Sequence, residues 1–235
     1  MLKIHIVGSG STGNGYILET SNSAITLECG VKFNAVLQSI DFNISKIVGG
    51  VCSHIHGDHA KYIHEYLKNG IPILNNVYEN FRSINISHRE KVTICDWTII
   101  PLKMVHDVDC FGFIISHPEC GNVFFATDTE DIPYELEGIN YAVIESNFSQ
   151  SVLDNKCLDK KINGFLAERI EKSHLSFEKC RQWLFNCDKS KLESVVLIHL
   201  SDGNSQARKY VTELQEELGI PIYTPNNKDL INLKF

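Results

Sequence analysis

The chain has 235 residues, of which 43% are hydrophobic and 22% are charged, and its formal net charge is −7. This composition is typical of a globular protein with one sizeable core, so we expect a single domain over residues 1–235. The negative charge gives no support to broad nucleic-acid binding. The sequence contains no stretch of about 18 apolar residues, the length that predicts a membrane span, so no membrane partner is expected.

Eight cysteines are scattered along the chain, and none is spaced as Cys-x-x-Cys. Several lie inside apolar, strand-like runs, which is typical of reduced and mostly buried thiols. We therefore expect a cytoplasmic protein without a cysteine metal site. The first seven residues resemble a strand and lack a long apolar region, so we expect no signal peptide.

Short apolar runs bounded by turn residues predict strands, and longer segments with helical spacing predict helices. Several predicted strands end in His or Asp, with helices between them. This arrangement predicts two β-sheets packed face to face, with helices outside and a site along one rim. Strands are predicted over residues 3–8, 16–20, 24–28, 47–52, 71–74, 92–94, 98–105, 110–116, 123–126, 141–145, 195–198 and 222–224. Helices are predicted over residues 33–40, 60–67, 77–84, 157–171, 177–186 and 206–218.

Residues 53–59 read Ser-His-Ile-His-Gly-Asp-His and follow a predicted buried strand. Their polar side chains lie on a loop between two rigid elements, where metal and catalytic sites are expected. On an extended backbone His54 and His56 project to the same side and can share one metal ion. Asp58 and His59 lie past the glycine and can serve a second ion. A loop of solvated histidines is the alternative, and this dense spacing of ligand-type residues disfavours it.

The motif His-x-His-x-Asp-His is the signature of the metallo-β-lactamase superfamily, and the chain resembles that family. The resemblance implies an α/β fold, a four-layer αββα sandwich of the metallo-β-lactamase type, and metal-dependent hydrolysis. It also implies the remaining ligands, which are His106, the bridging carboxylate Asp128, and His199. The implied first ion is bound by His54, His56 and His106, and the second by Asp58, His59 and His199, with Asp128 between them.

Imidazole and carboxylate ligands suit Zn²⁺ and also Mn²⁺ or Fe²⁺. Two ions about 3.5–4 Å apart hold a bridging hydroxide as nucleophile. We therefore expect two divalent ions, Zn or Mn, as cofactors, and we count Asp58 among the catalytic residues as well as the ligands. The family usually has Asp, as a partner of the ligands, where Glu28 stands in this chain.

Further segments resemble the YycJ/WalJ-type branch of the superfamily. They are Gly-Ser-Gly-Ser-Thr-Gly-Asn at residues 8–14, Glu-Ser-Asn at 145–147, Arg-Ile at 169–170, His-Leu-Ser at 174–176, and His-Leu-Ser-x-x-Asn at 199–204. The chain departs from that branch at Phe148, Ser149, Ser173 and Phe177. The branch is associated with DNA 5′-exonuclease activity. The resemblance therefore implies a metal-dependent phosphodiesterase, a nuclease whose expected substrate is DNA rather than RNA.

His174 lies outside the implied ligand set. The resemblance implies that it contacts the scissile phosphate or protonates the leaving group, and a structural hydrogen bond at a helix start is the alternative. Candidate substrate-binding residues are Ser11, Asn14, Asn147, Ser201 and Asn204.

Two other functions remain open at this point. The first is a metallo-hydrolase of a small ester, lactone, thioester, β-lactam or cyclic phosphodiester. The second is a non-catalytic binding subunit, which the complete ligand set disfavours. Labelled DNA assayed against a small phosphodiester separates the enzyme classes, and metal content separates an enzyme from a binding subunit. The sequence predicts no oligomeric state.

Overall fold

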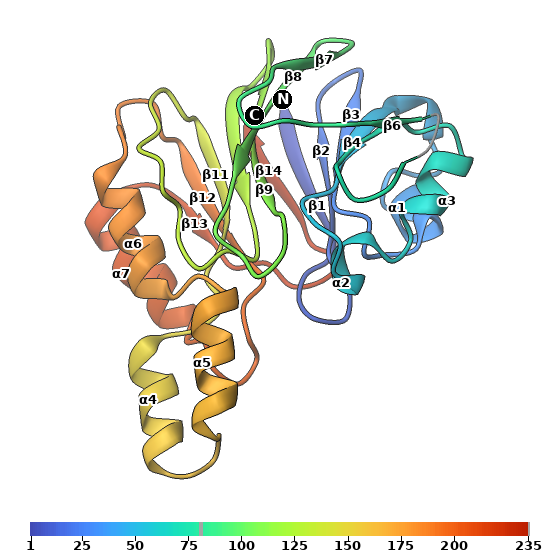
Figure 1. The fold of residues 1–235 in the computed structure, drawn as a ribbon. Coiled ribbons are helices and arrows are strands. Elements are labelled where there is room, and N and C mark those ends of the chain that lie inside the picture. Colours follow the sequence, from blue (N-terminus) through green and yellow to red (C-terminus); the bar gives the residue numbers. More distant parts are fainter. Residues whose placement is uncertain (80–81, 235) are drawn as a thin grey trace. The chain divides into compact units, whose positions relative to one another are not determined.

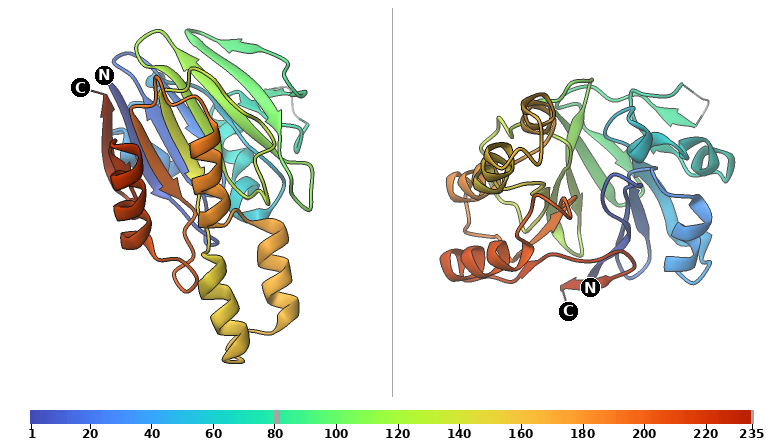
Figure 2. Two further views of the ribbon diagram at one scale, coloured as in Figure 1. Left: turned by 90° about the vertical axis from the view of Figure 1, so that its left-hand side faces the viewer. Right: turned by 90° about the horizontal axis from the view of Figure 1, so that it is seen from below.

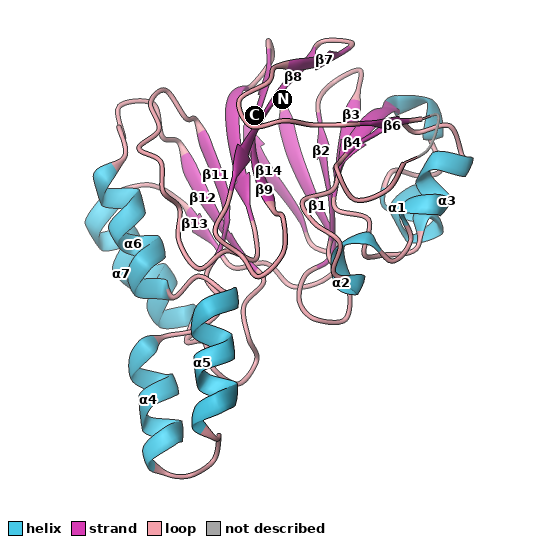
Figure 3. Ribbon diagram, in the orientation of Figure 1, coloured by secondary structure: helices cyan, strands magenta, loops and turns pink. Residues whose placement is uncertain are grey.

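The computed structural model describes residues 1–79 and 82–234, and its strands form two seven-stranded sheets with helices beside them (Figures 1 and 3). Within the described residues the chain divides into two compact units. Unit 1 consists of Met1–Leu102, Phe113–Gly121 and the residues from Pro225 on, and unit 2 consists of Lys103–Gly112 and Asn122–Thr224. The single domain expected over residues 1–235 stays a prediction.

The first sheet belongs to unit 1. The first three strands of the chain pair antiparallel with one another, and the next three strands of the chain are added in parallel. The strand order is β14 (Leu230–Lys234), β1 (Leu2–Gly8), β2 (Gly15–Glu19), β3 (Ala24–Leu27), β4 (Ile47–Val51), β5 (Ile73–Leu74) and β6 (Ser83–Ile84). The sequence did not predict β14, which pairs antiparallel with β1.

The α-helices of unit 1 pack against this sheet through one apolar cluster. The rings of Phe33 and Tyr66 lie 4.9 Å apart between their centroids, and both belong to a cluster with Ile17 of β2 and Ile73 of β5. Burying such side chains is the main stabilising contribution to a fold of this size. The helices are α1 (Phe33–Ser39), the 3-10 helix η1 (Ile44–Lys46), α2 (Gly57–Ala60) and α3 (Ile63–Lys68).

The second sheet has the order β13 (Ile222–Tyr223), β12 (Ser194–Ile198), β11 (Tyr141–Glu145), β10 (Gly121–Ala126), β9 (Phe111–His117), β8 (Trp97–Lys103) and β7 (Val92–Ile94). Strands β10 to β13 are parallel, so their carboxyl ends meet at one edge. Both β11 and β12 are buried along their whole length, which explains the apolar runs at 141–144 and 195–198.

Unit 2 also contains the helices α4 (Gln150–Leu158), α5 (Gly164–Ser173), α6 (Phe177–Asn186) and α7 (Ala207–Leu218). The last two pack together through Phe177 and Tyr210, whose rings stack with 3.9 Å between their centroids. Trp183 of α6 contacts Phe124 of β10, with 4.9 Å between the ring centroids. No helix in the described part of the chain is both long enough and apolar enough to cross a membrane.

Three helix predictions are wrong in part. The helix predicted over residues 60–67 is broken at 61–62, between the end of α2 and the start of α3. The helix predicted over residues 77–84 is absent from its described positions, because Ser83–Ile84 is the strand β6 and Asn75 Oδ1 accepts from Val77 N and Tyr78 N in a turn. Residues 80 and 81 of that prediction lie outside the described residues. The segment predicted over 157–171 is broken at 159–163, and a second helix begins where Asn163 Oδ1 accepts from Leu166 N.

The packing around residue 30 leaves no room for a side chain, whereas residue 57 has open space beside it. A Cβ on Gly30 would lie 1.7 Å from Asp58 O and 2.7 Å from Asn14 N, whereas a Cβ on Gly57 would meet no atom within 4 Å. We predict that Gly30→Ala lowers the free energy of unfolding by about 3 kcal/mol, because the backbone atoms it meets must move. The matched change Gly57→Ala should alter it by less than about 0.5 kcal/mol. Urea unfolding measures both, and equal midpoints for Gly30→Ala and wild type would contradict the packing described.

Candidate functional site

The predicted metal loop of unit 1 follows β4. Residues 52–56 leave the end of that strand in an extended loop, and α2 begins at Gly57. His54 and His59 are fully buried, whereas the half-buried side chains of His56 and Asp58 reach the surface. A buried imidazole on a loop between two rigid elements is well placed to hold a fixed orientation.

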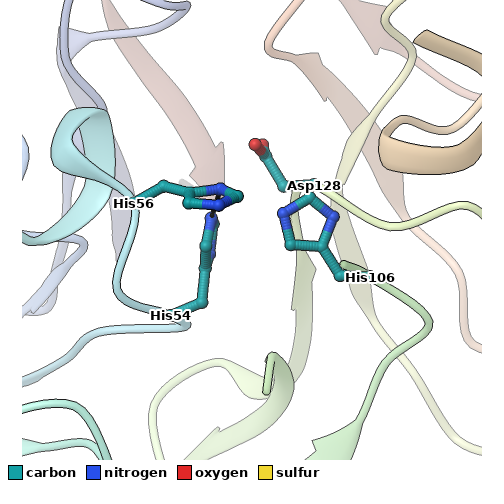
Figure 4. A group of neighbouring side chains, drawn as sticks. All are labelled: His54, His56, His106 and Asp128. Carbon is teal, nitrogen blue, oxygen red and sulfur yellow. Dashed lines mark hydrogen bonds between the residues drawn. The ribbon is translucent and has the colours of Figure 1, made fainter. Parts of the chain in front are cut away.

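Two pairs of donor atoms on this loop have the spacing that one metal ion requires. His54 Nε2 lies 3.1 Å from His56 Nδ1 (Figure 4), and His59 Nε2 lies 3.3 Å from Asp58 Oδ2. Two nitrogens bound to one tetrahedral zinc ion lie about 3.3 Å apart, given metal–nitrogen bonds of about 2.0–2.1 Å. Nitrogen and carboxylate donors at this spacing therefore fit divalent metal binding.

Glu28 orients this loop from the end of β3. Its side chain is fully buried and its φ is 65°, in the left-handed region. Glu28 Oε2 accepts from Ser53 N at 3.3 Å and lies 3.4 Å from His59 Nδ1. The longer side chain, at the place where the resembled family has Asp, thus still reaches a predicted ligand histidine. Such contacts fix the ring orientation of metal ligands.

Asn14 forms hydrogen bonds to the same loop. Its fully buried side chain accepts at Oδ1 from Gly10 N at 2.9 Å and from Tyr16 Oη at 3.1 Å. The Nδ2 group donates to His59 Nε2 at 3.0 Å, and the backbone N donates to Asp58 O at 2.7 Å. Asn14 therefore contacts two predicted ligands of the second ion. Ser11 lies exposed on the same glycine-rich loop, and substrate binding by either residue stays a prediction.

Unit 2 places its predicted ligands after strands. His106 follows β8, Asp128 follows β10 and His199 follows β12. The donor atoms of His106 and Asp128 lie within 4.8 Å of each other (Figure 4), and His199 Nδ1 lies 3.6 Å from Asp128 Oδ1. Asp128 and His199 have φ values of 45° and 53°. Such left-handed conformations of residues other than glycine are strained and cluster at functional sites.

Glu145, at the end of β11, makes side-chain contacts with the candidate site that the sequence did not predict. Its side chain is fully buried. Oε1 accepts from His174 Nδ1 at 2.7 Å and from His199 Nδ1 at 3.0 Å. Oε2 accepts from Leu175 N at 2.9 Å and from Thr129 N at 3.2 Å. The Glu-Ser-Asn segment resembles that of YycJ/WalJ-type proteins, but His174, which this carboxylate contacts, lies 29 residues away in the sequence.

Two consequences follow for the histidines that Glu145 contacts. Because an ionised carboxylate only accepts hydrogen bonds, both Nδ1 atoms carry the proton, and Nε2 of each ring is the remaining nitrogen. Asn147 Nδ2, which lies 3.1 Å from His199 Nδ1, then donates to His199 O at 2.9 Å and not to the ring. The donor atoms of Asp128, Glu145, His174 and His199 all lie within 4.8 Å of one another. Unit 2 alone therefore offers a metal-capable group that includes His174, in addition to the three ligands predicted from the sequence.

The local electrostatics favour the charged forms of both Glu145 and His174. Burial acts to raise the pKa of Glu145, but the charge of His174 and the hydrogen bonds from both histidines outweigh it, so this pKa lies below 4.5. Burial acts to lower the pKa of His174, but the charge of Glu145 and its hydrogen bond outweigh it, so this pKa lies above 6.5. The imidazolium form of His174 thus persists to higher pH than that of an ordinary histidine.

The other predicted substrate-binding residues of unit 2 form hydrogen bonds with neighbouring residues of the same unit. Asn147 is buried, and its Nδ2 donates to His199 O at 2.9 Å. Ser201 N donates to Asn147 O at 2.9 Å. Asn204 Oδ1 accepts from Lys156 Nζ at 2.8 Å. These contacts bring Asn147 and Ser201 beside His199, and substrate binding by all three stays a prediction.

No protein-family model and no curated protein sequence matches the chain. Solved structures do match it. The metallo-β-lactamase fold protein YhfI from Bacillus subtilis is 16% identical with a TM-score of 0.72, covering 99% of this chain and 100% of YhfI. A diphosphatase of the PhnP family is 12% identical with a TM-score of 0.64, covering 99% and 98%. The short form of human tRNase Z is 10% identical with a TM-score of 0.63, covering 99% and 100%.

This likeness shows the fold. The predicted α/β class, a four-layer αββα sandwich of the metallo-β-lactamase type, is confirmed. At such low identities the likeness does not extend to the branch, so the resemblance to YycJ/WalJ-type proteins stays a prediction.

The pair of Glu145 and His174 makes stability depend on pH. A raised histidine pKa contributes stability that is fully present below the unfolded pKa and is lost as pH rises through the folded pKa. We predict that His174→Gln, measured with chelator present, lowers the free energy of unfolding by about 1–3 kcal/mol at about pH 5.5, and by less at about pH 8.5. His64→Gln, at an exposed position of α3, is the control. A His174→Gln deficit that grows with pH would contradict the assignment.

Proposed function

We propose that the protein is a metal-dependent phosphodiesterase that degrades nucleic acid, with DNA as substrate and a 5′-exonuclease-like action. One observation carries the proposal. His174, outside the predicted ligand set, is held by the buried carboxylate of Glu145, which also holds the predicted ligand His199. A phosphodiester in nucleic acid has a poor leaving group, and a positioned acid beside the metal ligands suits that chemistry. Among the structural neighbours, the diphosphatase and the tRNase Z support a phosphate-bond hydrolase.

The proposal includes two divalent ions, Zn or Mn, with the ligands predicted from the sequence. Unit 1 would supply His54, His56, Asp58 and His59, and unit 2 would supply His106, Asp128 and His199. When bound, such ions activate water as a nucleophile and stabilise negative charge on the attacked phosphate. The nitrogen and oxygen donors of each unit, at the spacings given above, support this part of the proposal. The eight free cysteines support a cytoplasmic enzyme.

In this proposal His174, held by Glu145, would supply the proton that the leaving oxygen requires. His174 Nδ1 donates to Glu145 Oε1, so Nε2 is the atom that donates a proton or a hydrogen bond to the leaving oxygen. Glu145 stabilises the imidazolium through its negative charge, which explains the raised pKa of His174. On this proposal Ser11, Asn14, Asn147, Ser201 and Asn204 bind or position the substrate, and Asp58 serves both as ligand and in catalysis.

A second candidate is hydrolysis of a small phosphate compound such as a cyclic phosphodiester. The diphosphatase among the structural neighbours favours it. The two candidates share the metal ligands and differ in the substrate, so direct comparison of substrates separates them.

The test uses His174→Ala with two substrates, end-labelled DNA and bis-p-nitrophenyl phosphate, in the presence of Zn²⁺ or Mn²⁺. We predict that turnover of DNA falls by about 10²–10⁴, the usual contribution of a general acid. The nitrophenyl diester has a good leaving group and should lose much less. Metal content should stay that of the wild type, because His174 is not a proposed ligand.

His64→Ala, at an exposed histidine, is the matched control. Loss of a metal ion in His174→Ala, or unchanged DNA turnover, would contradict the proposed role. Equal losses on both substrates would reassign His174 from acid to phosphate positioning. A wild-type protein that cleaves the small diester but no labelled DNA or RNA would favour the second candidate.

A further inference from the structure

Helices α4 and α5 of unit 2 form an antiparallel hairpin with the turn 159–163 at its tip. The hairpin extends away from strands β11–β13 of the same unit in both side views (Figures 1 and 2). The hairpin begins at Gln150, three residues after Asn147, and ends at His174, which caps the carboxyl end of α5. The hairpin therefore connects two residues that the proposed function uses.

The hairpin is a structured arm rather than a loose excursion. Its inner face has its own apolar cluster, in which Leu153 and Ala167 are buried with Phe148. Its base is tied to α6, because Glu178 accepts from Ser149 Oγ at 2.9 Å and from Gln150 N at 3.1 Å. A surface at the tip is thus held in a fixed relation to His174.

The outer side of the tip is apolar and exposed. Leu158 and Phe165 are both 80% exposed, and Leu166 is 43% exposed. Single exposed apolar residues are normal, but three at one tip, two of them almost bare, mark a candidate interaction surface. An exposed aromatic ring on a rigid helix is the kind of platform on which a nucleic-acid base stacks.

Cations surround this apolar tip. Residues 156–169 contain four basic residues (Lys156, Lys160, Lys161 and Arg169) and two acidic ones (Asp159 and Glu168), in a chain whose net charge is −7. Lys161 is paired with Asp159 at 2.8 Å. Lys160 and Arg169 are exposed, and neither takes part in an ion pair with any described residue. Both are therefore available to bind phosphate.

We propose that the tip of the α4–α5 hairpin is a docking surface for a single strand of nucleic acid, with a base stacked on Phe165 and phosphates bound by Lys160 and Arg169. This inference rests on the proposed function and names the arm that would hold its substrate. The positive charges of Lys160 and Arg169 are complementary to phosphates, and the exposed ring of Phe165 beside them suits stacking of a base. Three apolar side chains are also too few for a stable protein interface, which buries about 1,200–2,000 Å².

The arm sets a length for the substrate. Phe165 precedes His174 by nine residues along α5 and its cap, which at 1.5 Å per residue is about 14 Å. About four stacked nucleotides, at about 3.4 Å each, cover that distance. A strand must therefore extend about four nucleotides beyond the reacting phosphate before it reaches the ring.

The test measures binding of a fluorescent single strand of about twelve nucleotides by the full chain, alongside KM and kcat for the same strand. We predict that Phe165→Ala raises Kd and KM about 5- to 100-fold, as expected for loss of one stacked base. Lys160→Gln should reduce the dependence of Kd on salt by about one unit of slope. A substrate of about two nucleotides and bis-p-nitrophenyl phosphate should be turned over as by the wild type.

Phe42→Ala, which removes another exposed phenylalanine (61% exposed), is the matched control and should leave all values unchanged. Unchanged Kd for the long strand in Phe165→Ala would overturn the inference, as would an equal loss on the short substrate. A change of oligomeric state in Phe165→Ala on gel filtration would assign the tip to contacts between copies instead. If the wild type binds the strand through Phe165 but cleaves none, the docking surface stands and the proposed nuclease fails.

Discussion

The fully buried carboxylate of Glu145 is the interaction on which the proposed catalytic part of unit 2 depends. Its four accepted hydrogen bonds join the end of β11 to the residue after Asp128, to the start of the His-Leu-Ser segment, and to two histidine rings. A buried charge is strongly unfavourable unless its hydrogen bonds are satisfied, so these partners are mutually required. The same contacts direct Nε2 of His199 and of His174 away from the carboxylate, and in the proposed function one ring binds a metal while the other contacts the substrate.

Three residues of the candidate site lie just after strands and have strained backbone conformations. Glu28, Asp128 and His199 all adopt left-handed conformations, each of which costs about 1–3 kcal/mol. Surrounding contacts hold these residues, as Glu28 illustrates by accepting a hydrogen bond from Ser53 N and lying 3.4 Å from His59 Nδ1. In unit 1 the close approach of the backbone at Gly30 to Asp58 O, together with Asn14, holds the loop that carries the histidines. Fixed geometry of this kind is what a metal centre requires.

Much of this architecture could be predicted from the sequence, and the failures have physical causes. Continuous apolar runs predicted the strands at 141–145 and 195–198, because both faces are covered there. The spacing of His54, His56, Asp58 and His59 predicted donor pairs that the folded loop does bring together. The role of Glu145 could not be predicted, because its partner His174 lies 29 residues away. The helix expected over 77–84 failed because Asn75 satisfies two backbone N–H groups and begins a turn.

The central claim is that His199 binds a metal whereas His174, held by the same carboxylate, serves the substrate. Anomalous X-ray scattering from crystals grown with Zn²⁺, recorded on both sides of the zinc absorption edge, tests it most directly. The account predicts two zinc peaks per chain, one of them about 2.0–2.1 Å from His199 Nε2, and no zinc bound to His174 or Glu145. A zinc ion ligated by His174 or Glu145, or the absence of any peak beside His199, would contradict it.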